Sequence, residues 1–163
     1  MISLENKKYP TIKNLRKNSY YSGILKNLYA GSEGECIVFL QLRYQMYVLK
    51  NFYPEIADLL EDIAKTELLH QQLLSDAILM SGGDPTYSNS QNKWIGGRQI
   101  DYVKDIKQIL SFDIELKEKI IIDYKIAIAK IDNLEIKKLL ASILQDEEIH
   151  LRKLRKLQTS ILS

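Results

Sequence analysis

Four long segments of this sequence repeat apolar residues every three to four positions, the period of an amphipathic helix. They span residues 22–51, 54–80, 101–131 and 134–163. A short break joins the first segment to the second, and another joins the third to the fourth. The polar stretch 82–98 connects the two pairs. This pattern predicts an all-α fold, a four-helix bundle of two antiparallel helical hairpins joined by a long connection.

Length and composition agree with one helical domain. The 163 residues can bury a core of their own, and 7 Gly with 3 Pro supply few of the turns that an all-β fold needs. The single cysteine excludes a disulfide framework, a cysteine-based zinc site and a rubredoxin-type iron site. We expect residues 1–21 to form an N-terminal strap and residues 22–163 to form the bundle.

Ionisable side chains interrupt the inward-facing apolar stripe of each segment near its middle. A buried charge is costly unless it pairs with another group or with a metal. These groups are therefore the candidate functional residues. In chain order they are Glu35, Glu67, His70, Lys117, Tyr124, Glu147 and His150.

Both histidines of the chain follow a glutamate by three residues, in Glu67-x-x-His70 and Glu147-x-x-His150. Residues at this spacing lie on the same side of a helix. Chance would place a glutamate before both histidines in roughly 0.5% of random arrangements. Glu35 lies 32 residues before Glu67, which brings the two to the same height in an antiparallel pair. Carboxylates with imidazole suit iron or manganese, and this set is typical of the two-metal site of ferritin-like bundles.

Almost the whole chain resembles the ferritin-like proteins near the rubrerythrins and manganese catalases, of the stand-alone bundle type without a rubredoxin module. The matching segments are YAGSEGECIVFLQLRYQ, IAKTELLHQQLL, MSGGDPTY, WIGGRQIDY and LLASILQDEEIHLRKL. The resemblance implies a dimetal site that handles peroxide or dioxygen. By motif position, the metal ligands that it implies are Glu35, Glu67, His70, Glu147 and His150.

The third helical segment departs from this family pattern. Relatives read roughly EKxAIxxY where this chain reads KEKIIIDY, so Lys117 occupies the position of a glutamate ligand. Lys117 also lies on the inward stripe, between Ile114 and Ile121. As an alternative, a π-bulge would turn the neighbouring Glu118 inward. For Tyr124, core packing with a hydrogen-bonded hydroxyl is favoured over a redox role.

Lys117 changes the charge of the site. Four carboxylates with neutral histidines balance two divalent ions, whereas three carboxylates and one ammonium leave −2, which balances one. We expect the ammonium to pair with Glu147 or Glu35 inside the bundle. The cofactor prediction is therefore iron or manganese, one or two ions, with one favoured.

Three functions remain open at this stage. The first is a metal-binding oxidoreductase, peroxidase-like, catalase-like or ferroxidase-like, acting on peroxide, dioxygen or ferrous iron; no catalytic residue is assigned. A peroxidase would need an external electron donor. The alternative is a degenerate one-metal or metal-free bundle with a structural or assembly role, and Lys117 is the residue that separates the two. An iron-storage subunit is the third.

Location and partners follow from composition. A formal net charge of +2 argues against a nucleic-acid partner. The sequence has neither an apolar targeting segment nor a membrane-spanning run, which predicts a cytoplasmic protein without a membrane partner. A homo-oligomer, a dimer at least, is predicted because the N-terminal tyrosines would otherwise be exposed. These are Tyr9, Tyr20, Tyr21 and Tyr29.

Overall fold

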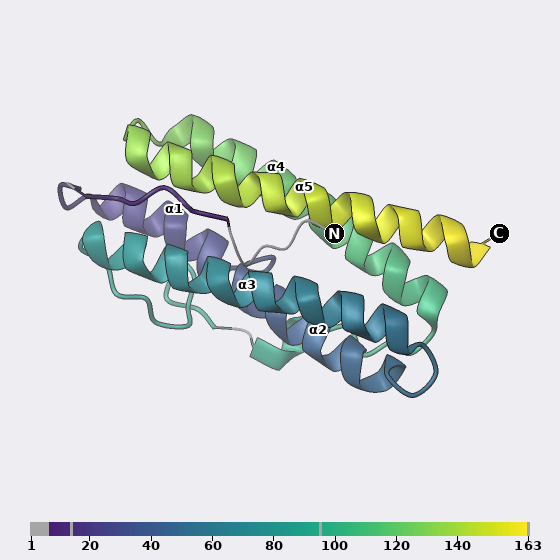
Figure 1. Ribbon diagram of the computed structural model, residues 1–163. Coiled ribbons are helices and arrows are strands. Elements are labelled where there is room, and N and C mark those ends of the chain that lie inside the picture. Colours follow the sequence, from purple (N-terminus) through teal and green to yellow (C-terminus); the bar gives the residue numbers. More distant parts are fainter. Residues whose placement is uncertain (1–6, 14, 95, 163) are drawn as a thin grey trace.

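The computed structural model describes residues 7–13, 15–94 and 96–162, which form helices and loops with no strand among them (Figure 1). In chain order the elements are α1 (Ser19–Ala30), α2 (Glu35–Leu49), α3 (Pro54–Met80), the short 3-10 helix η2 (Gly96–Gln99), α4 (Ile106–Lys130) and α5 (Leu134–Leu162). Helix α3 packs along α1 and α2, and α4 packs along α5, so two antiparallel hairpins face each other. The predicted all-α bundle of two hairpins is confirmed.

The first helix of the bundle is divided in two, where the sequence predicted one continuous helix over 22–51. The break lies at Gly31–Gly34, between α1 and α2. The backbone folds so tightly here that a Cβ on Gly34 would lie 2.6 Å from the nitrogen of Gly31, so this turn requires glycine. The break makes Glu35 the first residue of α2.

Helix α4 begins at Ile106, five residues after the predicted start at Asp101. The side chain of Gln41 donates to the carbonyl of Asp101 and accepts from its amide, at 2.9 and 2.7 Å. These two bonds hold Asp101 against α2 instead of in a helical turn. Asp105 then caps α4 by accepting from the amides of Lys107 and Gln108.

The other two long helices have the predicted bounds. Helix α3 starts at Pro54, where a missing amide proton costs nothing, and ends at Met80 before the Ser81–Gly83 turn. Helix α5 starts after Asn133, whose side chain accepts from the amide of Ile136 at 2.9 Å. No helix in the described part of the chain is long and apolar enough to cross a membrane.

The segment before α1 follows the outside of the bundle. Residues 7–13 and 15–18 have no regular secondary structure, and the amide of Lys13 donates to Glu135 on α5 at 2.9 Å. Helix α1 begins at Ser19, three residues before the predicted start, because Asn18 accepts from the amide of Tyr21. Of the predicted strap over 1–21, residues 1–6 and 14 lie outside the described residues and residues 19–21 belong to α1. We therefore use the name strap for residues 7–13 alone.

Three of the four N-terminal tyrosines are at least partly buried within the chain. Tyr9 and Tyr21 hydrogen-bond to other segments through their hydroxyls, and Tyr29 is buried. Of the four, Tyr20 alone is largely exposed, at 57%. Most of the tyrosines that motivated a homodimer are thus covered at least in part within the chain, and the homodimer stays a prediction.

Candidate metal centre

The five residues predicted as metal ligands converge inside the bundle. Glu35 begins α2, the pair Glu67 and His70 lies in the middle of α3, and the pair Glu147 and His150 lies on α5. Each of the five is at most 1% exposed. The two helical Glu-x-x-His pairs therefore face each other across the core, as their positions on the inward stripes predicted.

Four of these residues surround one point. The Nδ1 atom of His70 lies 3.3 Å from Oε2 of Glu67, 3.3 Å from Oε1 of Glu147 and 3.7 Å from Oε1 of Glu35. One ligand atom from each of the four lies within 4.8 Å of every other. Three carboxylates and one imidazole at this separation form a set that a single divalent cation could bring together.

Hydrogen bonding shows that this set fits a cation. Among the described residues, each of the four has one buried atom without a hydrogen-bond partner. These atoms are Glu35 Oε2, Glu67 Oε2, His70 Nδ1 and Glu147 Oε1. Buried polar atoms are rarely left unpaired, because losing water without gaining a partner is costly. A bound cation would satisfy all four.

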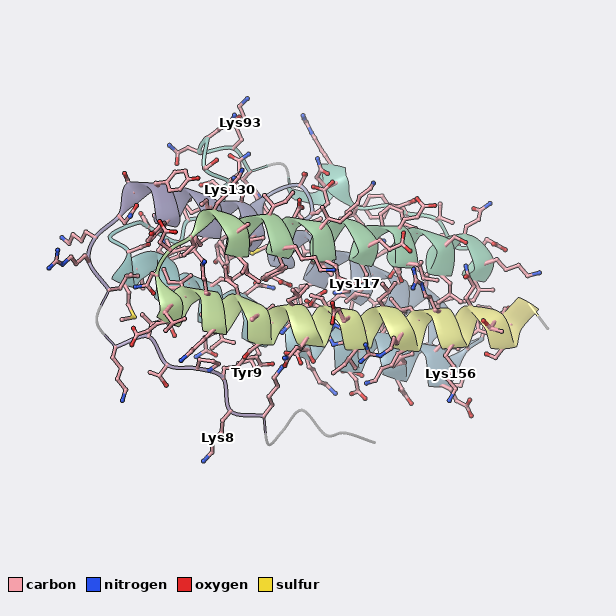
Figure 2. The ribbon with its side chains drawn as sticks, turned by 90° about the horizontal axis from the view of Figure 1, so that it is seen from above. Lys8, Tyr9, Lys93, Lys117, Lys130 and Lys156 are labelled. Carbon is pink, nitrogen blue, oxygen red and sulfur yellow. The ribbon has the colours of Figure 1, made fainter. Side chains whose placement is uncertain are left out.

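Lys117 of α4 lies on the other side of the same carboxylates and points into the bundle (Figure 2). Its ammonium donates to Oε1 of Glu67 at 2.6 Å and to Oε2 of Glu147 at 2.5 Å. The ion pair with Glu147 agrees with the prediction, but the second partner is Glu67 instead of Glu35. Glu67 and Glu147 thus each give one oxygen to Lys117 and present the other to His70.

Electrostatics keep Lys117 charged. Burial alone would lower the pKa of Lys117, but the carboxylates of Glu147 and Glu67 outweigh it and hold that pKa well above its usual value. Burial and Glu67 raise the pKa of Glu147, yet the opposing effects of Lys117 and neighbouring hydrogen bonds bring it to about 2. The ammonium is thus a fixed positive charge within the centre.

The second histidine lies on the Lys117 side of the centre. Nδ1 of His150 is 3.1 Å from Oε1 of Glu67, the oxygen that also accepts from Lys117. His150 is absent from the set of mutually close ligand atoms. Nδ1 of His150 also lies 3.6 Å from Oε1 of Glu147, and neither of its ring nitrogens has a hydrogen-bond partner among the described residues, so His150 borders the centre beside Lys117.

Glu118 does not replace the missing glutamate. Helix α4, described throughout, is α-helical from Ile106 to Lys130 without a π turn, so the alternative of a bulge is wrong. The Glu118 side chain is 44% exposed and pairs with Arg155 of α5 on the outer surface. Two adjacent residues of a regular α-helix point about 100° apart, and the inward one here is Lys117.

Tyr124 is fully buried two turns after Lys117 and donates its hydroxyl hydrogen to Oε1 of Glu35. This agrees with the prediction of core packing with a hydrogen-bonded hydroxyl. The bond uses Oε1 of Glu35, whereas Oε2 has no hydrogen-bond partner in the part of the chain that the structure describes. Burial, followed by the negative charges of Glu67 and Glu147, raises the pKa of Glu35 well above its usual value.

Asp146 contacts the centre through His70 and was not among the predicted site residues. It is fully buried, and its Oδ2 lies 3.2 Å from Nε2 of His70. A carboxylate that accepts from one imidazole nitrogen orients the other nitrogen toward a metal. Asp146 follows Ile143 by three residues, so it lies on the inward stripe of α5. This three-residue spacing is the sequence feature from which the inward position of Asp146 could have been predicted.

Comparison with known proteins agrees with this architecture. Over 99% of its length, the chain superposes on 81% of a crystal structure of wild-type KatB, a manganese catalase from Anabaena, with 20% identity and a TM-score of 0.86. A bacterioferritin from Desulfovibrio desulfuricans, with a diiron site, matches 88% of the chain and 82% of its own at 20% identity and a TM-score of 0.71. At this identity the likeness establishes the fold alone.

No curated protein sequence matches this chain significantly. A family model, however, covers most of the bundle. The model for rubrerythrin matches residues 26–158, which include α2, α3, α4 and most of α5, with every residue of the centre. With a ferritin-like fold, a buried cluster of carboxylates and imidazoles, and a family match over most of its length, this chain belongs to the rubrerythrin family.

Proposed function

We propose that this protein binds a single iron or manganese ion at Glu35, Glu67, His70 and Glu147, with the Lys117 ammonium in place of a second ion. The main observation behind the proposal is that the two carboxylate oxygens of Glu67, and likewise those of Glu147, face different partners. Glu67 and Glu147 each hold Lys117 with one oxygen, while their other oxygens are the unpartnered atoms beside His70.

Charge supports one ion per chain. Three carboxylates and one ammonium sum to −2, which one divalent cation neutralises. A second dication beside the fixed ammonium would leave excess positive charge in a medium of low dielectric constant. Carboxylate oxygens with one imidazole favour iron or manganese over metals that prefer thiolates.

The proposed activity is that of an oxidoreductase acting on peroxide, dioxygen or ferrous iron. The bound ion would supply the redox chemistry. The chain would supply a dry interior, the orientation of His70 by Asp146, and the hydrogen bond from Tyr124 that fixes Glu35. A peroxidase version would need an external electron donor, whereas a catalase version would not.

Purified without chelators and then loaded with Mn(II) or Fe(II), the protein is expected to retain one ion per chain by elemental analysis. His70→Gln should lose that ion, because it removes the nitrogen at the centre of the cluster. The matched variant His150→Gln should keep it, because His150 lies outside the cluster. Two ions in the wild-type chain, or equal loss in both variants, would contradict the one-ion centre.

Metal binding should strengthen as pH rises. Burial lowers the pKa of His70, but Glu35 and the hydrogen bond to Asp146 outweigh it and raise that pKa well above its usual value; the pKa of Glu35 is raised too. At pH values below these raised pKa values both groups hold protons, which they must release to bind a cation. Affinity should therefore increase through the ordinary histidine range and beyond it.

Calorimetric titration with Mn(II) at pH 7 in two buffers of different ionisation enthalpy measures this release. We expect an apparent binding enthalpy that changes with the buffer and corresponds to at least one proton released per ion bound. An enthalpy independent of the buffer would mean that both groups are already deprotonated. In that case the charges assigned to the metal-free centre would be wrong.

A metal-free bundle with a structural or assembly role is the second candidate function. It is supported by the same ion pairs, because Lys117 neutralises part of the carboxylate charge without any metal. Absence of bound metal after loading, together with full helical content by circular dichroism, would favour it over the oxidoreductase.

A further inference from the structure

Asp146 is held from two directions. On the side of the bundle, its Oδ2 faces Nε2 of His70 at 3.2 Å. On the side of the strap, the ammonium of Lys7 donates to Oδ1 at 2.6 Å and the hydroxyl of Tyr9 donates to Oδ2 at 2.6 Å. Both oxygens of one buried carboxylate are therefore committed, and two of the three donors come from the strap.

The two strap residues are themselves anchored. The ammonium of Lys7 also donates to the carbonyl of Ser142, one turn before Asp146 on α5, at 2.7 Å. The ring of Tyr9 meets the ring of His70 edge to face, with centroids 6.2 Å apart and planes at 80°. In Figure 2, Tyr9 lies beside the bundle while its neighbour Lys8 points away from it. The strap thus contacts both members of the His70–Asp146 pair.

These contacts restrict a rotation that Asp146 would otherwise make. The terminal torsion of an aspartate is broad, so a carboxylate with one partner samples many orientations. Lys7 and Tyr9 fix both oxygens, which keeps Oδ2 directed at His70. The hydrogen bond to Nε2 in turn directs Nδ1 of His70 toward the carboxylates of the centre.

We propose that Lys7 and Tyr9 are positioning residues of the metal centre, which act through Asp146 to hold the His70 ring in the orientation that binds the ion. This inference rests on the proposed metal site. It assigns to the strap a role in metal affinity, and it couples a segment outside the bundle to a ligand on α3.

The first experiment measures Mn(II) affinity by calorimetry in Tyr9→Phe and Lys7→Met. We expect each variant to bind up to roughly 10-fold more weakly, the lower end of the usual effect of losing a direct partner of a metal-ligating histidine, because Lys7 and Tyr9 act one step further out through Asp146. Lys7→Arg, which keeps the charge, should recover much of the loss. The control Tyr44→Phe removes a hydroxyl that donates to the carbonyl of Tyr102 at 2.9 Å, and should leave affinity unchanged.

The same variants in an Asp146→Ala background decide whether the strap acts through Asp146. If it does, Tyr9→Phe and Lys7→Met should add no further loss once the carboxylate is gone. Losses that add in full would show a merely structural contribution and would overturn the proposal. Unchanged affinity in both single variants would overturn it as well.

A measurement on the metal-free protein separates this inference from the proposed function. Nitrogen-15 NMR of the imidazoles should detect a protected Nε2–H on His70 in the wild type. Its exchange with water should accelerate at least 10-fold in Tyr9→Phe and Lys7→Met. A wild type that binds no metal but shows this change would refute the metal site and support the positioning role. An unchanged exchange rate in both variants would refute the positioning role.

Discussion

Replacing Lys117 with glutamate is expected to raise the number of tightly bound divalent ions from one to two per chain. The ammonium of Lys117 holds one oxygen of Glu67 and one of Glu147, beside His150. A glutamate at this position would free both oxygens and add a fourth carboxylate. The net charge of the carboxylates would then be −4, which two dications neutralise. Elemental analysis after Mn(II) loading and gel filtration measures the change.

Lys119→Glu is the matched control, because it makes the same charge change at an exposed position of the same helix. It should leave the stoichiometry at one. If the wild-type chain already holds two ions, or if Lys117→Glu still holds one, the ammonium does not stand in for a metal. The number of bound ions would then have to be explained by the geometry of α4 instead of by the charge of Lys117.

Lys117→Met is expected to destabilise the metal-free protein by about 3–5 kcal/mol, the usual cost of removing one partner from a buried ion pair. Methionine keeps most of the side-chain length but leaves Glu67 and Glu147 without their strongest cationic partner. Urea unfolding in the presence of a chelator measures the loss. Adding Mn(II) should restore part of it, because a cation again meets the carboxylates.

Lys119→Met serves as the control and should change stability by less than about 0.5 kcal/mol, as exposed substitutions usually do. A loss below about 1 kcal/mol for Lys117→Met would contradict the ionised state of the two glutamates. Protons would then replace the ammonium at little cost, and the centre would carry less charge than its two ion pairs indicate.

Most of the fold could be predicted from the sequence, because helical periodicity is a local property of each segment. The stripes place α3 and α5 correctly, since Pro54 and the Ser81–Gly83 turn mark the two ends of α3 and Asn133 marks the start of α5. The break at Gly31–Gly34 was missed because Gly31 occupies a position in the apolar stripe. Only the close backbone approach at Gly34 reveals the turn, and that approach is a feature of three-dimensional structure.

The convergence of the centre was predictable for the same reason. The inward positions of Glu67, His70 and Lys117 follow from helix geometry, and Lys117 could be expected to find a carboxylate. The carboxylate that pairs with Lys117 depends on how α3, α4 and α5 are shifted along the bundle axis relative to one another. Helical periodicity does not determine that shift. The contacts of Lys7 and Tyr9 with Asp146 could not be predicted from any sequence pattern, because the strap has no regular secondary structure.

The buried ammonium has a consequence for how the chain is assembled. A metal ion must be captured from solution, so its occupancy depends on supply, whereas Lys117 is covalently part of the chain and meets the carboxylates at a fixed effective concentration. As soon as α3, α4 and α5 pack together, Glu67 and Glu147 acquire a counter-charge. We therefore expect the bundle to fold without metal, so that the proposed ion would bind afterwards as a separate event.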